Sequence, residues 1–289
     1  MSYQLIEHTD PRLFHNAVID NLLRSEAECC TQIGIVRRMV HDGYIPVSTD
    51  ELDRPILWTV QNGLHIEVVA LQTLKDKMIV TRGSPAAMEY LADALASRRW
   101  AGSSLIGVTP SVETLVERYA TLSGRKRKLM VRLRVFQLER VNWPKRAGGE
   151  MRLSCRDDRQ VLARFIAGFE TEIGETSQEN ALARADRLIA DGRLYLWTDP
   201  NPVAMAAWAG PTPSGVRVNW VYTAPDRRRK GYASNLVANL TQRLLDQGRK
   251  FCFLFTDLTN PTSNSIYQRI GYRPVSDSER WEFGEPTSR

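Results

Sequence analysis

Hydrophobic and polar residues follow two different periods along the chain, and each change of period marks a change of secondary structure. Residues 11–40 carry apolar side chains at helical spacing, and Ser84-Pro85 is typical of a helix start, with serine as cap and proline first. The first half therefore predicts the order α, β, β, β, α, β, α, β. After residues 11–40, its predicted elements are PILWTVQ, LHIEVVALQ, KMIVTRG, SPAAMEYLADALASR, SSLIGVTP, SVETLVERYATLSG and KLMVRLRVFQL.

Residues 142–150, NWPKRAGGE, are rich in proline, glycine and charge, which is typical of a linker. The pattern that follows this linker predicts the order α, α, β, β, β, α, β, α, β. Because the two halves share an element order, we expect a duplicated α/β unit. The expected domains are residues 1–142 and residues 150–289.

The junction near residue 231 combines a strand, a basic run and a helix. Apolar positions from Val216 to Val221 predict the strand, and Pro225 ends it. Apolar residues from Ala233 to Leu244 recur at helical spacing, so the run of basic residues occupies the turn into a helix N-terminus. Unpaired N–H groups and the helix dipole favour phosphate there. The alternative is a capped turn with solvated arginines.

Composition and charge fit a soluble globular protein, with 43% hydrophobic and 25% charged residues. The net charge is +6, and two basic clusters stand out, GRKRK at 124–128 and DRRRK at 226–230. Such clusters suit a nucleic acid or a phosphate-bearing small molecule. The sequence has no helix-turn-helix or RNA-binding signature, so nucleic acid is not the expected partner.

The four cysteines show no Cys-x-x-Cys spacing, so the sequence predicts neither a disulfide framework nor a metal site. The N-terminus lacks a basic region followed by an apolar run, so no signal peptide is expected. No apolar segment reaches the roughly 18 residues that span a membrane. These features favour a cytoplasmic protein without a membrane partner, as a monomer or a homodimer.

Two motifs in residues 151–289 resemble one known family. Residues 228–233 have the form Arg-x-x-Gly-x-Ala and follow Val-x-x-Val-Tyr-Thr-x-Pro. This resembles the acetyl-CoA signature of the GNAT superfamily of N-acetyltransferases. Residues 256–275, TDLTNPTSNSIYQRIGYRPV, resemble the Asn-x-x-Ser/Ala-x-x-x-Tyr-x-x-x-Gly-Phe/Tyr pattern of the same superfamily. The first half resembles it by element order only, so a degenerate GNAT-like lobe is expected there.

The resemblance implies an α/β fold with the mixed sheet of GNAT acyltransferases, and acetyl transfer from acetyl-CoA to a primary amine. It implies that Tyr267 protonates the leaving thiolate, that the Val221 N–H stabilises the oxyanion, and that Val221 and Thr223 hold the pantetheine arm. The N–H groups of residues 229–234 would take the diphosphate, and Arg228 would add charge. The implied cofactor-binding residues are Val221, Tyr222, Thr223, Arg228, Arg229, Lys230, Gly231, Tyr232, Ala233, Ser234, Asn260, Ser263, Asn264 and Tyr267.

The acceptor amine also has to lose a proton, and three carboxylates are candidates for the base. Asp257 ends a predicted strand before the second motif, and Glu170 and Glu172 lie on a predicted helix. Each could instead be an ordinary surface carboxylate, or approximation of the reactants could make a base unnecessary. The acceptor stays open between a small amine, an amino acid, an antibiotic and a protein amine. Alternative functions are a non-catalytic acyl-CoA-binding protein and an acetyltransferase for a nucleic-acid-associated substrate.

Overall fold

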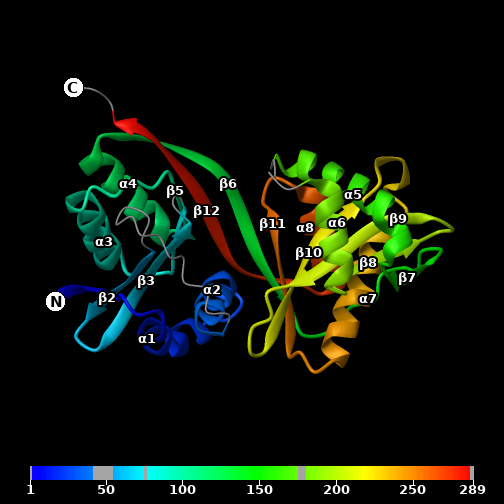
Figure 1. Cartoon of the computed structure of the whole chain (residues 1–289), viewed down its shortest axis with the longest axis horizontal. Coiled ribbons are helices and arrows are strands. Elements are labelled where there is room, and N and C mark those ends of the chain that lie inside the picture. Colours follow the sequence, from blue (N-terminus) through cyan, green and yellow to red (C-terminus); the bar gives the residue numbers. More distant parts are fainter. Residues whose placement is uncertain (1, 42–54, 75–76, 175–179, 287–289) are drawn as a thin grey trace. The chain divides into compact units, whose positions relative to one another are not determined.

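The computed structural model describes residues 2–41, 55–74, 77–174 and 180–286, which form two compact units (Figure 1). The first unit consists of Met1–Val135, Asp257–Thr259 and Val275–Arg289. The second unit consists of Phe136–Thr256 and Asn260–Pro274. The units therefore do not coincide with the consecutive segments 1–142 and 150–289, and independent folding of either segment stays a prediction.

The two halves of the chain repeat one order of elements, β, α, α, β, β, β, α, β, α, β. The first half contains β1 (Tyr3–Glu7), α1 (Pro11–Leu23), α2 (Cys30–His41), β2 (Ile56–Asn62), β3 (His65–Leu74), β4 (Lys77–Val80), α3 (Pro85–Ser97), β5 (Ser104–Val108), α4 (Ser111–Ser123) and β6 (Arg125–Leu138).

The second half contains two additional 3-10 turns, η2 and η3. Its elements are β7 (Glu150–Leu153), η2 (Arg156–Asp158), α5 (Arg159–Ile173), α6 (Ala181–Ala190), β8 (Leu194–Thr198), β9 (Pro202–Ala209), β10 (Gly215–Thr223), η3 (Pro225–Arg227), α7 (Tyr232–Asp246), β11 (Phe251–Asp257), α8 (Pro261–Ile270) and β12 (Arg273–Pro286). The sequence pattern missed β1 and β7. Both are short, and neither contains a fully buried residue, so backbone pairing rather than hydrophobic alternation identifies them.

Helix starts and stops follow the local chemistry that the sequence predicted. The Ser84 hydroxyl accepts a hydrogen bond from the Ala87 N–H, and the Asn260 side chain accepts one from the Ser263 N–H. Gly124 and Gly271 end α4 and α8 in the left-handed conformation, with φ of 67° and 111°. The predicted helix start at Ser84-Pro85 is thus confirmed, and a cap of this kind can be predicted because it depends on residues only a few positions apart.

The sheet order exchanges the last strand of each half. In the first unit the order is β1-β2-β3-β4-β5-β12-β6, and β12 pairs antiparallel with β5. In the second unit the end of β6 is followed by β11-β10-β9-β8-β7. Phe136 and Leu138 of β6 are accordingly buried in the core of the second unit.

The core of the second unit has two parts, one on each face of its sheet. On one face, α7 and α8 bury a cluster that includes Leu236, Leu240 and Ile270. On the other face, α5 and α6 bury a cluster that includes Leu162, Ile166 and Leu188. Figure 1 shows these helices around strands β8 to β11. Burial of these apolar stripes positions both helix pairs against the sheet.

The first unit is layered in the same way. Helices α3 and α4 cover a cluster with Met88, Leu91 and Leu115, and helices α1 and α2 cover another with Phe14 and Ile33. The shared order of elements therefore produces shared layering. Among helices of the described residues, none combines the length and hydrophobicity that a bilayer crossing requires.

The start of α5 is fastened by a buried carboxylate. Asp158 accepts hydrogen bonds from both terminal nitrogens of Arg152 at 2.7 Å and from the Cys155 N–H at 2.8 Å, and these bonds lower its pKa. Asp158→Asn should therefore lower the free energy of unfolding by about 2 kcal/mol at pH 7. The difference should disappear as the pH falls through the lowered pKa, because the wild-type carboxylate is then protonated too. Denaturant unfolding at a series of pH values measures it, and a pH-independent difference would contradict the ionic interpretation.

Candidate active site

Strand β10 changes its pairing in the middle. Its parallel pairing with β11 covers only Gly215↔Phe251 to Arg217↔Phe253. On its other edge the pairing with β9 continues to Thr223↔Ala204 but is interrupted between Asn219 and Tyr222. There two residues, Trp220 and Val221, face one residue of β9, which is a β-bulge, and Trp220 has a φ of 54°. The edge of β10 towards β11 is thus open from Asn219 onwards.

The turn from β10 into α7 places a helix N-terminus at the end of this open edge. Arg229 and Gly231 both adopt positive φ, 63° and 83°. Gly231 directly precedes α7, and a Cβ built on it would lie 3.7 Å from Asn235 Nδ2 and 3.8 Å from Ala147 Cβ. Backbone conformation rather than crowding therefore favours glycine at this position.

Backbone donors collect at this turn. The first backbone hydrogen bond of α7 is donated by the Asn235 N–H to the Gly231 oxygen. In the described part of the chain, the N–H groups of residues 229–234 have no hydrogen-bond acceptor. Thr223 Oγ1, at the end of β10, is buried and has no hydrogen-bond partner there either. Such orphaned groups at a helix N-terminus suit the oxygens of a diphosphate.

The basic run contributes less free charge than its sequence suggests. Arg228 forms an ion pair with Glu172, donates a hydrogen bond of 3.0 Å to the Thr223 carbonyl and lies over the Tyr222 ring. Arg227 pairs with Asp226 at 3.2 Å. Arg229 and Lys230 are exposed and form no ion pair with a described residue. The structure therefore assigns Arg228 to holding the turn, and leaves Arg229 and Lys230 available to an anion.

Other predicted cofactor residues have side chains that are engaged in the protein. Tyr232 is 5% exposed, and its hydroxyl donates to Asp199 at 2.5 Å. Tyr222 is buried under α5, and burial is the main cause of its raised pKa. Only the backbone groups of these two tyrosines remain to contact a ligand. Ala233 and Ser234 are half-buried in the first turn of α7.

The residues of the second motif build the start of α8. Asn260 caps the helix through its side chain, and its carbonyl accepts a hydrogen bond of 2.8 Å from Asn264 Nδ2. Ser263 supplies the N–H that the cap satisfies. These three residues therefore have structural partners, and any ligand contact of theirs stays a prediction.

Tyr267 lies on the inner side of α8. It is 7% exposed, with its ring 6.0 Å from the Tyr272 ring and 6.5 Å from the Phe136 ring. Burial raises the pKa of its hydroxyl well above the ordinary value for tyrosine, so the group is protonated at neutral pH. Within the described residues this hydroxyl makes no hydrogen bond, whereas the Tyr272 hydroxyl pairs with Thr241 Oγ1 at 2.7 Å. Tyr267 is thus a proton donor without a protein acceptor.

All three candidate bases have partners. Asp257 ends β11 and accepts hydrogen bonds of 2.7 Å from the Thr259 N–H and hydroxyl, which shapes the turn into α8. Glu170 forms an ion pair with Arg184, and Glu172 forms one with Arg228. Each of the three carboxylates is therefore engaged by a hydrogen bond or an ion pair within the protein. A base role for any of the three stays a prediction.

The corresponding turn of the first half is filled by protein. A Cβ on Gly83 would lie 2.4 Å from Val68 Cγ2, and the Gly83 oxygen accepts a hydrogen bond from Ser111. Ser84 caps α3 and donates to Glu67 at 2.6 Å. The carboxylate of Glu67 at this helix start would repel a phosphate, so the first half lacks the features of the β10–α7 turn.

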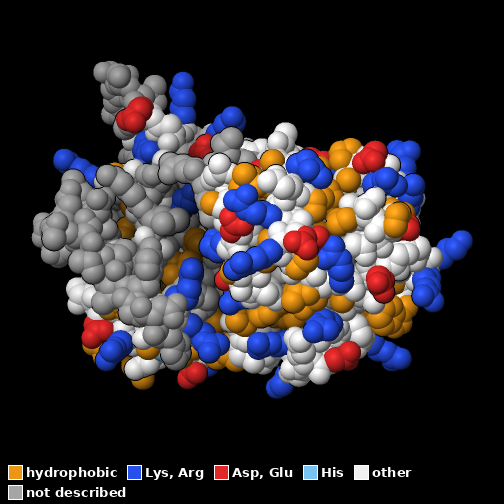
Figure 2. All heavy atoms as spheres, turned by 45° about the vertical axis from the view of Figure 1, so that its right-hand side comes forward, with side chains coloured by type: hydrophobic (Ala, Val, Ile, Leu, Met, Phe, Trp, Pro, Cys, Tyr) orange, Lys and Arg blue, Asp and Glu red, His pale blue; other side chains and the backbone are white. Residues whose placement is uncertain are grey.

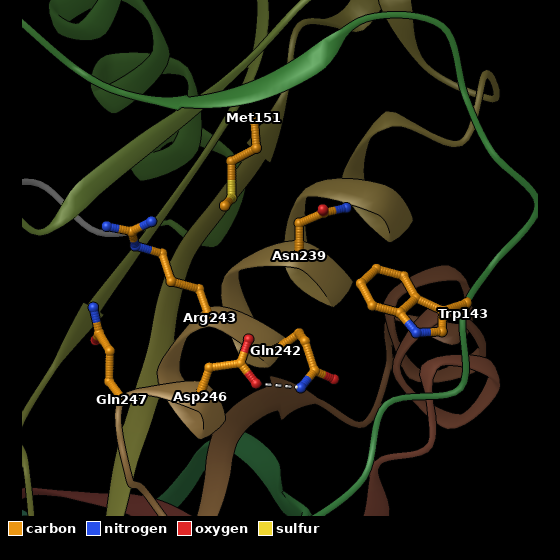
Figure 3. A pocket seen from close by; sticks show the side chains of 7 residues that line it. All are labelled: Trp143, Met151, Asn239, Gln242, Arg243, Asp246 and Gln247. Atoms are coloured by element: carbon orange, nitrogen blue, oxygen red, sulfur yellow. Dashed lines mark hydrogen bonds between the residues drawn. The ribbon is translucent and has the colours of Figure 1, made fainter.

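A hollow of about 480 Å³ lies along the later turns of α7 and is lined by Trp143, Met151, Asn239, Gln242, Arg243, Asp246 and Gln247 (Figure 3). Its α7 residues begin at Asn239, two helical turns beyond Gly231. The only dashed contact drawn among the lining side chains is Gln242 to Asp246, which lie one turn apart. The hollow is therefore separate from the helix N-terminus.

The two arginines of the cluster GRKRK contact other parts of the protein. Arg125 donates to the carbonyls of Gly102, Phe283 and Gly284, and Arg127 pairs with Glu117. On the face in Figure 2, Lys and Arg side chains are spread over the surface with acidic side chains between them.

The sequence pattern missed two residues that fasten the candidate site. Asn235 is 5% exposed, and its Nδ2 donates at 3.0 Å to both the Gly231 and the Lys145 carbonyl, so it ties the linker to the turn. The Asp199 carboxylate accepts the hydrogen bond of the Tyr232 hydroxyl. A polar residue on the apolar stripe of α7 is the signal that could have identified Asn235.

Loss of this fastening should weaken ligand binding. For the CoA binding that the resemblance implies, Asn235→Ala should lower the affinity by about tenfold, because the Gly231 turn and the linker lose a shared donor whose hydrogen bonds contribute about 1 kcal/mol each. Asn239→Ala is the control, since Asn239 lies one turn further along α7 and donates only to the Asn235 carbonyl. Titration calorimetry with CoA compares the two variants. Equal affinities would show that Asn235 does not organise the site.

Comparison with known proteins found one matching family model and several similar solved structures. Residues 196–281 match the family described as FR47-like protein. A GCN5-related N-acetyltransferase from Sphaerobacter thermophilus is similar in structure, with a TM-score of 0.61, 12% identity, and coverage of 97% of this chain and 95% of that chain. One from Kribbella flavida has a TM-score of 0.53 and 19% identity, covering 97% and 96%.

A tandem GNAT protein from the clavulanic acid biosynthesis pathway has a TM-score of 0.53 and 10% identity, and the match covers 100% of both chains. No curated protein matches the sequence. At these identities the likeness concerns the fold, and it confirms the expected mixed α/β architecture with two GNAT-like lobes.

Proposed function

We propose that the chain is a member of the GNAT superfamily and an acetyl-CoA-dependent N-acetyltransferase, because residues 196–281 match the FR47-like family and the fold is similar to that of GNAT acetyltransferases. The fold is one that serves acyl transfer. The acetyl donor and the amine acceptor are part of the proposal. The observation that carries it is the row of unpaired N–H groups at residues 229–234.

Residues of this chain fit the parts of acetyl-CoA. The N–H groups of residues 229–234 would bind the diphosphate, with Arg229 and Lys230 adding charge. The open edge of β10, through the backbone of Val221 and Thr223, would pair with the amides of the pantetheine arm. The buried Thr223 Oγ1 lacks a hydrogen-bond partner among the described residues, and a ligand group would supply one.

The reaction forms a C–N bond and breaks a C–S bond. The amine lone pair attacks the thioester carbonyl, the amine nitrogen gives up a proton to water, and the sulfur leaves and gains a proton. The bulge at Trp220–Val221 turns a backbone N–H out of the β9 ladder, where it would stabilise the oxyanion. The Tyr267 hydroxyl would donate its hydrogen to the sulfur and be reprotonated from solvent.

The paired states of Asp257, Glu170 and Glu172 support a mechanism without a dedicated base. The amine would then lose its proton to solvent, and approximation of the two substrates would supply most of the rate. Activity would rise with pH as more of the acceptor amine becomes neutral.

Two measurements test the proposal. Calorimetry with CoA measures donor binding, and release of free thiol from acetyl-CoA in the presence of an amine panel measures transfer. We expect both binding and amine-dependent thiol release. Binding without thiol release for any amine would favour a non-catalytic acyl-CoA-binding protein, and absence of binding would contradict the assignment altogether.

A further inference from the structure

Two polar groups of β10 are buried without a partner on the face of the sheet that α5 covers. Arg217 Nε and Asn219 Oδ1 are inaccessible to solvent and make no hydrogen bond within the described residues. Burial of an unsatisfied donor or acceptor is costly, so such groups call for an explanation. Here the unpartnered group of Arg217 is a cationic donor, and that of Asn219 is a neutral acceptor.

The pairing register puts both side chains on the same face. Asn219 stands opposite Ala207 and Arg217 opposite Ala209, and Ala207 packs in the cluster under α5 with Leu162 and Ile166. Arg217 also lies over the ring of Phe255, at 5.8 Å from the ring centroid. Cross-strand neighbours share a face of a sheet, so the two orphans point to the α5 side.

Both residues lie where β10 and β11 stop pairing. Arg217 belongs to the last residue pair that β10 forms with β11. Asn219 is the next residue of β10 whose side chain lies on the same face of the sheet. The bulge follows at once, and its Trp220 packs on Phe169 of α5 at 5.0 Å between ring centroids. The proposed diphosphate site, formed by the N–H groups of residues 229–234, lies at the start of α7. Helix α7 covers the opposite face of the sheet. A molecule held by Arg217 and Asn219 would therefore reach the open edge of β10 from the side away from α7.

The charges nearby leave that of Arg217 unbalanced. Glu170 is paired with Arg184, and Glu172 is paired with Arg228. In the part of the chain that the structure describes, no carboxylate pairs with Arg217. A partly buried guanidinium without a counter-ion favours an anionic ligand, and a carboxylate matches its planar set of donors.

Resting on the proposed function, we infer that the acceptor is a small amine that carries a carboxylate, which Arg217 binds while the amide oxygen of Asn219 accepts a hydrogen bond from the amine. This pairing of one donor and one acceptor satisfies both orphaned groups. It orients the amine towards the open edge of β10, where the thioester carbonyl would lie. The amine loses one proton to solvent on transfer, and the carboxylate is unchanged.

Matched acceptors test this substrate class. Each pair consists of an α-amino acid and the amine left after removal of its carboxylate, such as phenylalanine with phenethylamine and leucine with isopentylamine. Thiol release from acetyl-CoA should give kcat/KM about ten- to a hundredfold higher for the amino acid of a preferred pair. Arg217→Gln should remove this preference while CoA affinity, measured by calorimetry, stays within about twofold of wild type.

Arg193→Gln is the control. Arg193 is also half-buried, and its guanidinium lies over an aromatic ring, that of Trp208, at 5.1 Å. It should keep the preference for the amino acid. Arg217→Lys should keep part of it, because the charge remains but the bidentate geometry is lost.

Four results would overturn the inference while leaving the proposed function in place, and the first three concern the amine pairs and Arg217→Gln. They are equal or faster reaction of the amines without a carboxylate, a preference that survives in Arg217→Gln, and a loss of CoA affinity in that variant, which would assign Arg217 to the donor. A panel in which no amino acid reacts above the hydrolysis background would also overturn it. Failure of the wild-type protein to bind CoA would instead contradict the proposed function.

Discussion

Tyr267→Phe should lower the turnover of acetyl-CoA by about ten- to a thousandfold and leave CoA affinity nearly unchanged. The hydroxyl is buried and protonated, and it has no acceptor in the described protein, so its hydrogen is available to a sulfur that becomes negative. The aromatic ring and its contacts with Phe136 and Tyr272 remain in the variant. The measurement is the rate of thiol release at saturating acetyl-CoA.

The raised pKa of Tyr267 bears on the size of this effect. A thiolate is a weaker base than the phenolate of a buried tyrosine, so transfer of the Tyr267 proton to sulfur is unfavourable even after the C–S bond has broken, and reprotonation of Tyr267 from solvent has to complete it. Part of the stabilisation therefore comes from the hydrogen bond that Tyr267 donates to the developing thiolate before the proton moves. For this reason we expect the loss to lie nearer the lower end of the range.

Tyr272→Phe is the matched control for Tyr267→Phe. Tyr272 shares the same cluster, but its hydroxyl pairs with Thr241 Oγ1 at 2.7 Å. Its removal should reduce the free energy of unfolding by about 1 kcal/mol and leave turnover unaffected. If Tyr267→Phe behaved like this control, with lower stability and unchanged turnover where chemistry limits the rate, the proton-donor role would be wrong.

Gly231→Glu should abolish the rise in melting temperature that CoA causes. A ligand at a hundred times its Kd stabilises the folded protein by about 2.7 kcal/mol, which raises the melting temperature by a few degrees. A glutamate at residue 231 brings negative charge to the N–H groups meant for the diphosphate. It also strains a backbone with a φ of 83°.

Gly248→Glu separates these two effects. Gly248 follows the other end of α7, has a φ of 92°, and has no atom within 4 Å of a built Cβ. Gly248→Glu adds the same charge as Gly231→Glu and a similar backbone strain of about 1 to 2 kcal/mol. Residue 248, however, lies far from the turn between β10 and α7. This variant should be destabilised yet still respond to CoA. If CoA still raised the melting temperature of Gly231→Glu, the assignment of the diphosphate to the N–H groups of residues 229–234 would be wrong.

The sequence by itself determined the elements and their ends. The change of hydrophobic period located nearly every helix and strand, and the caps at Ser84 and Asn260 followed from residues within one turn. The strand–turn–helix junction at Gly231 was equally local, because a proline, a glycine and an apolar stripe suffice to define it. Local interactions of this kind can be deduced from neighbouring residues alone.

Tertiary structure decided what those elements do. In α1 Leu13 is one of the apolar residues at helical spacing, but it is 65% exposed, whereas Phe14, Val18 and Leu22 are buried. Which of two adjacent stripes faces inward depends on the sheet against which the helix packs. The exchange of β6 and β12 likewise rests on pairing between strands far apart in sequence.

The candidate site divides in the same way. Its motif residues are recognisable in sequence, but the ion pairs that occupy Arg228, Glu170 and Glu172 join positions on different elements. The unpartnered groups of Arg217 and Asn219 are visible only once every neighbour is in place. A hydrogen bond, or the lack of one, is a relation between groups that the fold brings together, and for that reason sequence periodicity could not indicate it.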